Sequence, residues 1–275
     1  MSLFLYCSEQ GLTWLREGRL PFLEATSLMD PFVSNIAVND SDAPIAVSDE
    51  ELSVELKTEY DALPPSLSSL MTFEYFKEQA LQKRTTIEAK IRKRSLPQTS
   101  SISLKQQKNL TLLCLYEKAD NPALWQYHGA NHQGIVIELD QSHAFFTAPH
   151  YKEVSQIFRA VKYGSDRPLK LKDTHPMTSL FHRSKHFAKE LEWRVLRPAS
   201  VSDKKIQLND HAVHLHKIPN SIIKSVTLGA AMTEPFKETL MSLLNTDLRY
   251  RRLPIMECRL DPALFQLHRV PVERN

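Results

Sequence analysis

The sequence predicts an α+β fold with a mixed, mostly antiparallel sheet and a helical segment in the first half of the chain. Residues 110–116 form a short, almost entirely apolar run, which is typical of a buried strand. Helical patterns are concentrated before residue 95, and short apolar runs separated by polar turns continue to the end of the chain. This distribution favours α+β over a regular alternation of strands and helices.

The first elements are predicted from their boundary residues. Strands over residues 3–7 and 19–23 flank a helix over residues 9–17, which Gly18 ends because glycine adopts positive φ without strain. A turn is expected over residues 28–32, since Asp30 precedes a proline.

A surface loop over residues 35–49 is followed by the predicted helical segment. Asp49 caps a first helix, the Pro64–Pro65 pair ends it, and a longer helix runs from Ser66 to about Arg94. The stretch from residue 95 to 103 is rich in Ser, Pro and Gln and is a candidate linker. We expect a single domain over residues 1–275 with a helical insertion around residues 49–95.

The second half is predicted to consist mainly of strands. Helices are expected over residues 179–190 and 234–245, and a hairpin with Asn209 and Asp210 in its turn. The remaining runs are predicted as strands, over residues 110–116, 135–139, 157–163, 193–196, 206–208, 212–216, 225–229, 252–260 and 264–270.

The composition is that of a soluble globular protein. The chain has 275 residues, 42% of them hydrophobic and 24% charged, and a net charge of +3 that is too small to argue for nucleic acid by itself. Basic clusters occur at residues 83–94 and 249–252. Such clusters usually form solvated surfaces, and contact with a polyanion is the alternative.

The cysteines and the N-terminus indicate a cytoplasmic protein. Cys7, Cys114 and Cys258 are far apart, lack zinc-site spacing and lie in apolar surroundings, so we expect buried free thiols. The chain has no recognisable signal peptide and no apolar run of about 20 residues, so no membrane partner is expected.

The segment from Leu124 to Asp140 carries the clearest candidate site. If it is extended or a turn, Trp125 and Tyr127 face the same side, and with His128 they can form a slot for a nucleobase or a nicotinamide ring. The alternative is that Trp125 anchors the core and Tyr127 packs at the start of a strand. Gly129 and Gly134 indicate a sharp turn or a close approach of another group.

A second candidate is the Glu190-x-Glu192-x-Arg194 pattern. On a strand these three side chains share one face, which places Glu192 for catalytic or electrostatic work beside a guanidinium. The alternative is a structural ion pair of Glu192 with Arg194 or Lys185. The cationic groups between residues 182 and 186 either bind phosphate or lie on a solvated helix.

Three histidines near one another raise the question of a metal. His214 and His216 share a strand face, and His211 lies nearby. No third ligand follows at a convincing spacing, so exposed strand histidines are favoured and no metal is expected.

The order of these motifs resembles the bacterial domain-of-unknown-function family 2971. The matching segments are Leu5-Tyr6, Asp30-Pro31-Phe32, Trp125 through Gly134, Val161-Lys162-Tyr163, Lys185, and Glu190 through Arg194. The chain departs from the family at Met29, where the family has Asn, at Val33, where it has Glu, and at Tyr127, which is one residue closer to the tryptophan. These departures argue against a catalytic role for the turn at Asp30.

The chain also resembles ADP-ribosyltransferases, which begin with strand, helix and strand and carry a late E-x-E. This resemblance implies NAD as cofactor and a macromolecular acceptor. Glu192 would then stabilise the oxocarbenium-like state with Glu190 and Arg194 beside it, while Tyr6, Trp125, Tyr127, His128 and Lys185 would bind the cofactor. Two alternatives are a nucleotide- or nucleic-acid-binding effector module without catalysis, which the basic residues 83–94 favour, and a nucleotide or phosphodiester hydrolase using Glu192 and His128.

Overall fold

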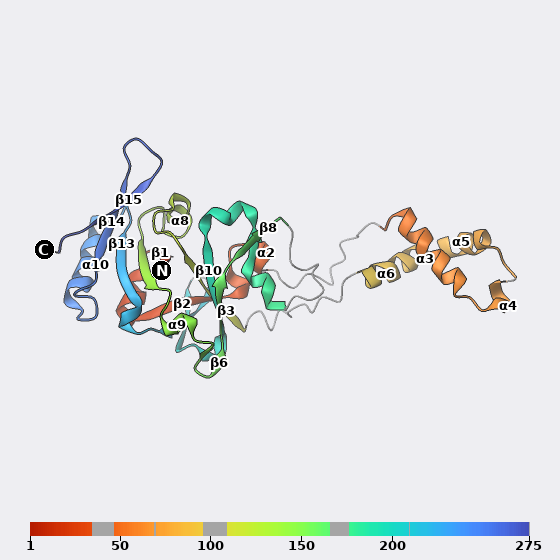
Figure 1. The fold of residues 1–275 in the computed structure, drawn as a ribbon, viewed down its shortest axis with the longest axis horizontal. Coiled ribbons are helices and arrows are strands. Elements are labelled where there is room, and N and C mark those ends of the chain that lie inside the picture. Colours follow the sequence, from red (N-terminus) through yellow and green to blue (C-terminus); the bar gives the residue numbers. More distant parts are fainter. Residues whose placement is uncertain (35–46, 69, 96–108, 166–175, 209, 275) are drawn as a thin grey trace. The chain divides into compact units, whose positions relative to one another are not determined.

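The computed structural model describes residues 1–34, 47–68, 70–95, 109–165, 176–208 and 210–274 (Figure 1). These residues confirm the α+β class and the mostly antiparallel sheet. The chain divides into two compact units. Unit 1 comprises Met1–Ala37, Ile102–Pro168 and Met177–Asn275, and unit 2 comprises Val38–Ser101 and Leu169–Pro176. Most of the loop expected at residues 35–49 and of the linker expected at residues 95–103 lies outside the described residues, namely residues 35–46 and 96–103.

Unit 2 is built from α3 (Asp49–Asp61), α4 (Pro65–Ser68), α5 (Phe73–Leu81) and α6 (Arg84–Ser95). The single long helix expected after Pro65 was wrong, because Thr72 starts a new helix by accepting a hydrogen bond from the backbone N–H of Tyr75 at 3.4 Å. The breaks allow the helices to enclose a small apolar core, which consists of Val47, Leu52, Leu56, Ile87 and Ile91.

Unit 1 is organised around one large sheet. Among the described residues eleven strands join it, and their pairings are antiparallel except for that of β13 with β14. The strands are β1 (Ser2–Cys7), β2 (Arg19–Glu24), β3 (Leu110–Tyr116), β4 (Ile135–Asp140), β7 (Ile157–Ala160), β10 (Glu192–Pro198), β11 (Lys204–Leu208), β12 (His211–Lys217), β13 (Ile223–Leu228), β14 (Ile255–Leu260) and β15 (Leu267–Pro271). The predicted strands are therefore confirmed with ends shifted by a few residues, except the one expected over residues 157–163, which is divided into β7 and a second short strand over Lys162–Gly164 in another sheet.

The central strand β3 creates a fork in this sheet. One of its edges pairs with β10 along the whole strand, from Leu110 to Tyr116. On the other edge Leu112 pairs with Leu23 of β2, whereas Tyr116 pairs with Phe4 of β1. Because one strand edge can hold only one neighbour at each position, β1 and β2 separate from each other beside β3.

The two faces of the sheet bury different groups. Alternate residues of a strand point to opposite faces, so Leu3 and Leu5 enter the main core, where α1 (Gly11–Glu17) and α10 (Glu234–Thr246) also pack. Phe4 and Tyr6 lie on the opposite face and join a smaller aromatic cluster with Tyr116 and Trp125. The candidate site is built on this second face.

Gly18 ends α1 as predicted, with a φ of 61°. Short helices complete unit 1: η1 (Ala25–Ser27), α2 (Pro31–Ser34), α8 (Pro122–Tyr127), α9 (Ala144–Thr147), η5 (Ala199–Val201) and η6 (Asn220–Ile222). The turn expected at residues 28–32 is correct up to Asp30, since Pro31 and Phe32 already belong to α2.

The continuous helix predicted over residues 179–190 was wrong. This stretch contains η3 (Pro176–Phe181), the strand β9 (His182–Ser184) and η4 (Lys185–Glu190). β9 pairs in parallel with β8 (Lys162–Gly164), which places Arg183 opposite Tyr163. A small hairpin of β5 (His150–Tyr151) and β6 (Val154–Ser155) lies elsewhere in unit 1.

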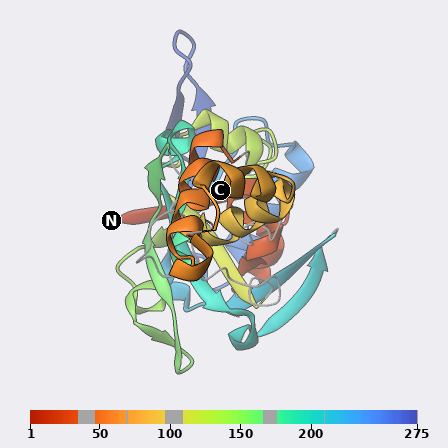
Figure 2. The same ribbon diagram turned by 90° about the vertical axis from the view of Figure 1, so that its right-hand side faces the viewer.

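The C-terminal strands form a hairpin that extends away from the rest of unit 1 in two views (Figures 1 and 2). β14 and β15 pair from Met256 to Leu260, and Phe265 lies fully exposed at the tip. No helix among the described residues is long and apolar enough to cross a membrane.

Candidate functional site

A cavity of about 550 Å³ lies at the fork of the sheet in unit 1. Its walls come from β1, β2, β3, β10 and β12, together with the end of α8, the segment before α2 and Arg183 of β9. The chemically active side chains among the lining residues are Tyr6, Cys7, Asp30, Cys114, Tyr116, Tyr127, His128, Arg183, Glu192 and Arg194. The cavity is thus assembled from segments that are far apart in the chain.

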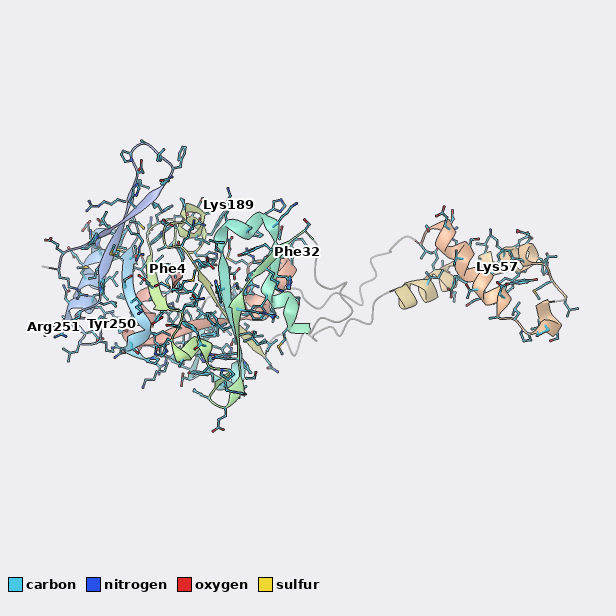
Figure 3. The ribbon with its side chains drawn as sticks, in the orientation of Figure 1. Phe4, Phe32, Lys57, Lys189, Tyr250 and Arg251 are labelled. Carbon is cyan, nitrogen blue, oxygen red and sulfur yellow. The ribbon has the colours of Figure 1, made fainter. Side chains whose placement is uncertain are left out.

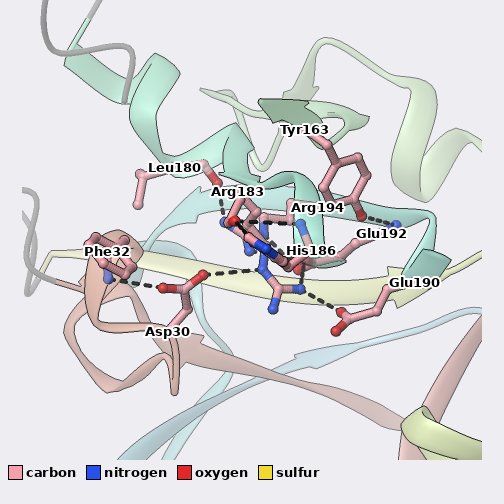
Figure 4. Close-up of polar contacts among 10 residues, drawn as sticks. Asp30, Phe32, Tyr163, Leu180, Arg183, His186, Glu190, Glu192 and Arg194 are labelled. Atoms are coloured by element: carbon pink, nitrogen blue, oxygen red, sulfur yellow. Dashed lines mark hydrogen bonds and ion pairs between the residues drawn. The ribbon is translucent and has the colours of Figure 1, made fainter. Parts of the chain in front are cut away.

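One end of the cavity is an ion network centred on Glu192 (Figure 4). Arg194 contacts both oxygens of this carboxylate, with Nε 2.7 Å from Oε1 and Nη2 3.0 Å from Oε2. Arg183 donates from Nη1 to Glu192 Oε2 at 2.8 Å and to Glu190 Oε2 at 2.5 Å. Its Nε lies 3.3 Å from Asp30 Oδ2. Two guanidinium groups therefore hold three carboxylates.

The strand register explains how this network forms. In the β10–β3 pair, Glu192 lies opposite Tyr116 and Arg194 opposite Cys114, so these four side chains share one face. The expectation that Glu190 shares this strand face was wrong, because Glu190 ends η4 and Leu191 turns the chain at a φ of 52° before β10 begins. Glu190 reaches the network from outside the strand.

The charges of the network stabilise one another. Burial opposes ionisation of Glu192, but Arg194 and Arg183 outweigh that penalty, so the pKa of this carboxyl is lowered. Burial also disfavours the cationic form of Arg183, and the attraction of Glu192 and Glu190 overcomes it, so its pKa is raised. For Glu190 burial wins over Arg183, and its pKa is raised. Glu192 is therefore a fixed anion and a poor base.

The network is braced by neighbouring groups. Arg194 also donates from Nη1 to the carbonyl oxygen of Leu180. The backbone N–H of Glu192 donates to the hydroxyl oxygen of Tyr163 at 2.8 Å, and Arg183 lies over the ring of Phe187 at 4.0 Å. Only 2% of Glu192 is exposed, so its position is determined by several independent contacts.

Beside this network the wall of the cavity is aromatic. The rings of Tyr116 and His128 are stacked at 5.6 Å, and Tyr6 meets Tyr116 edge-on at 5.6 Å. The hydroxyl of Tyr6 donates to the carbonyl oxygen of Lys118 at 2.8 Å, which fixes its ring. These three rings form a rigid wall.

The predicted pairing of Trp125 with Tyr127 on one side was wrong. The segment is not extended but belongs to α8, in which residues two apart point in nearly opposite directions. Trp125 is fully buried behind Tyr6, and its indole N–H donates to the carbonyl oxygen of Ala119 at 2.7 Å. Tyr127 lines the cavity and is 68% exposed.

His128 is the most adaptable polar group on the aromatic wall. Burial lowers its pKa, and Arg183 acts in the same direction against the opposing effect of Glu192. The imidazole is therefore neutral at neutral pH, with one donor and one acceptor nitrogen. Within the described part of the chain, neither ring nitrogen has a hydrogen-bond partner, so both are free to meet a ligand.

The loop after α8 is tightly packed. A side chain at Gly129 would collide with the Trp125 ring, and one at Gly134 would collide with the carbonyl oxygen of Cys7. Both glycines are thus places of close approach, as expected. Between them Ala130, Asn131 and His132 all adopt positive φ, from 50° to 66°, which is an unusual run for residues other than glycine.

The cavity brings together many of the residues predicted from the sequence, although not all. Glu192, Arg194, Tyr6, Tyr127 and His128 line it. Glu190 touches the network through Arg183, whereas Trp125 supports the wall from behind and Lys185 is exposed away from the lining.

Four lining residues were missed as members of the site: Asp30, Cys114, Tyr116 and Arg183. In the sequence, Asp30 belongs to the Asp30-Pro31-Phe32 segment of the family resemblance, and Arg183 is one of several cations in a stretch predicted to be helical. Cys114 is free and half-buried rather than buried, while Cys7 and Cys258 are free and buried as expected. Burial raises the pKa of the Cys114 thiol, with Glu192 adding to the effect.

Two of the three strand histidines, His214 and His216, are buried, contrary to expectation, whereas His211 is exposed as expected. His214 is 3% exposed and lies 3.4 Å from Glu24, while His216 is fully buried between the rings of Phe22 and Tyr151. Among the described residues no group of three or more His, Cys, Asp or Glu side chains is arranged to hold a metal ion.

Comparison with protein-family models, curated proteins and solved structures gives no match to this chain.

Proposed function

We propose that the protein binds a nucleotide in the cavity of unit 1, with NAD as the expected ligand. The observation that carries this proposal is an aromatic wall that adjoins a fixed acidic network in one cavity. Its volume of about 550 Å³ falls in the range of roughly 300–1,000 Å³ that is usual for small-molecule sites. Neutral His128 can both donate to and accept from a carboxamide or a base.

The charge balance favours a nicotinamide ring and its ribose over a phosphate at this end. Three carboxylates surround two guanidinium groups. Arg183 and Arg194 already form ion pairs with these carboxylates. Ribose hydroxyls donate well to carboxylate oxygens, whereas a phosphate would be repelled. The oxidised nicotinamide ring is cationic, so the exposed ring of Tyr127 in the cavity lining would attract it.

The reaction candidate is ADP-ribosyl transfer. In this reaction the bond between ribose C1′ and the nicotinamide nitrogen breaks, and its electron pair leaves with nicotinamide. A nucleophile of a macromolecular acceptor then bonds to C1′ and loses its proton. A carboxylate that stays anionic beside the ribose, as we expect of Glu192, would stabilise the positive charge that develops there.

Binding without transfer is the second candidate, and one specific observation favours it. Both oxygens of Glu192 already accept hydrogen bonds from guanidinium groups. A hydrogen bond from a ribose hydroxyl to Glu192 would have to use an oxygen that already accepts one of these bonds, or replace that bond. A binding or effector module needs no such rearrangement.

Calorimetric titration with NAD tests the binding proposal. Tyr127→Ala and His128→Ala should each weaken binding about 2- to 10-fold, because each removes an aromatic contact of about 0.5–1.5 kcal/mol. Phe265→Ala is the matched control, since this fully exposed ring lies outside the cavity. Absence of NAD binding at millimolar concentration, or equal affinity in all three variants, would refute the proposal.

Release of nicotinamide, measured by chromatography with protein or nucleic-acid acceptors, tests the transfer reaction. Glu192→Gln should abolish release, whereas Glu117→Gln should not, because Glu117 accepts from the Trp193 indole outside the cavity lining. Circular dichroism confirms that both variants are folded. NAD binding without release of nicotinamide would support the binding module. Turnover of a phosphodiester or nucleotide would support the hydrolase.

A further inference from the structure

A second hollow of unit 1, the basic groove, has a composition unlike that of the cavity. It encloses about 540 Å³. Two stretches of the chain form it: the start of η6 with the start of β13, and the turn between α10 and β14. Its lining residues are Asn220, Ile223, Lys224, Leu248, Arg249, Arg251, Arg252, Leu253 and Pro254.

The charge of the basic groove is entirely positive. Four of its lining residues are cationic, and none is an aspartate or glutamate. Lys224 pairs with Asp140 at 3.1 Å, outside the groove lining. Arg251 and Arg252 are exposed, and within the described ranges neither has an ion pair or a hydrogen bond. These two guanidinium groups are therefore available to an anion.

Arg249 is held in place at the edge of the basic groove. Asp247 accepts from its Nε at 3.0 Å and from its Nη2 at 2.6 Å, and the carbonyl oxygen of Arg16 accepts from Nη2 at 2.8 Å. Its Nη1 lies beside Gly18, where a side chain would occupy the same space. Because this guanidinium is already fixed, little additional side-chain entropy is lost when an anion binds to it.

We propose that the basic groove binds the phosphodiester backbone of a nucleic acid. Arginine forks match phosphate oxygens in geometry and charge, and cations distributed along a hollow of this size suit a chain of phosphates better than one ion. The groove is concave, whereas a helix that binds a membrane surface buries a protruding apolar face in the lipid. The only strongly exposed apolar residue of the lining is Leu248.

The basic groove is independent of the nucleotide cavity. The two hollows share no lining residue. Figure 3 shows Arg251 beside Tyr250, on the side of unit 1 away from Phe32, which follows the cavity residue Asp30 closely in sequence. The proposal therefore stands whether or not NAD binds in the cavity.

Fluorescence anisotropy with a labelled 20-nucleotide single strand, titrated over a range of salt concentrations, tests this site in the full-length chain. The variant Arg251→Gln/Arg252→Gln should weaken binding at least tenfold at low salt. It should also reduce the slope of log K against log salt by about 1.4, because each phosphate contact on a single strand contributes about 0.7. Lys204→Gln/Lys205→Gln removes the same charge from β11, outside the groove, and should bind like the unmodified protein.

Two further measurements complete the test. Thermal melting checks that both double variants fold. Vesicles containing anionic phosphatidylglycerol provide the competing polyanionic surface. Binding to vesicles but not to the oligonucleotide would overturn the proposal, as would an unchanged salt slope in the arginine variant or the absence of binding at low salt.

Discussion

At Glu192 a buried carboxylate keeps its charge because two arginines surround it. Removing one member of such a network leaves the others buried and unpaired, which typically costs about 3–5 kcal/mol. Stability and chemistry are therefore coupled at this residue, and a loss of activity in a variant is informative only when folding is measured too. The alternation of Glu192 and Arg194 along a strand offered their pairing as one alternative, beside a pair of Glu192 with Lys185.

Arg183 shows the limit of that prediction. It lies nine residues before Glu192, in a stretch whose local pattern resembles a helix. Its actual position depends on the pairing of β9 with β8, where Arg183 is opposite Tyr163. Such a pairing between distant segments leaves no local signal in the sequence.

His216 gives a prediction about pH. Burial, reinforced by Arg197, lowers the pKa of His216 from 6.5 to about 3. Between these values the unfolded chain binds a proton that the folded chain does not, so the stability contribution is complete above pH 6.5 and declines as the pH falls towards 3. Urea denaturation should show a loss of about 2 kcal/mol from this group between pH 7.5 and 5.

The control uses two histidine variants. His216→Phe should flatten the pH dependence, since phenylalanine takes up no proton and its ring can pack against Phe22 and Tyr151. His211→Phe changes an exposed histidine of the same strand and should leave the dependence unchanged. Equal pH profiles in all three proteins would show that His216 titrates normally in the folded state.

Among the elements, α8 decides which aromatic residues reach the cavity. Its start was signalled in the sequence: Asn121 accepts hydrogen bonds from the N–H groups of Ala123 and Leu124, and Pro122 occupies the first helical turn. The helix has only six residues, too short for hydrophobic periodicity to reveal it. Its helical geometry exposes Tyr127 and buries Trp125.

The loop that follows α8 should be intolerant of side chains at its glycines. Gly134→Ala would drive a methyl group into the carbonyl oxygen of Cys7 on β1, so we expect a loss of more than about 2 kcal/mol in chemical denaturation. Asn131→Gly in the same loop, where φ is 53°, should be neutral or stabilising by up to about 1 kcal/mol. A stable Gly134→Ala variant would mean that this strand and loop can move apart.

On the scale of the whole molecule, the class and most strands were predictable because hydrophobic patterns are local. The sheet order was not, since β3 joins β1, β2 and β10 across long sequence separations. The cavity arises at that junction and was invisible for the same reason. The helical segment was recognised, but its division into shorter helices depends on Thr72 and on packing.

The two-unit organisation leads to a deletion experiment. Every residue that lines the cavity belongs to unit 1, and unit 2 has its own apolar core. Replacing residues 38–101 with a flexible glycine–serine linker should therefore preserve a cooperative thermal transition and any ligand affinity of the cavity. Lengthening a loop costs little chain entropy, so the linker length is not critical. Loss of the folded state would show that unit 1 requires unit 2.

The fork at β3 also bears on how this fold could diversify. The space between β1 and β2 exists because the backbone of β3 changes partner, and no single side chain creates it. Substitutions at lining positions such as Leu23, Cys114 or Val213 could therefore reshape the hollow while the hydrogen-bonded framework persists. Proteins descended from one ancestor with this framework could acquire different ligand preferences, and a designer could reprogram the site without rebuilding the sheet.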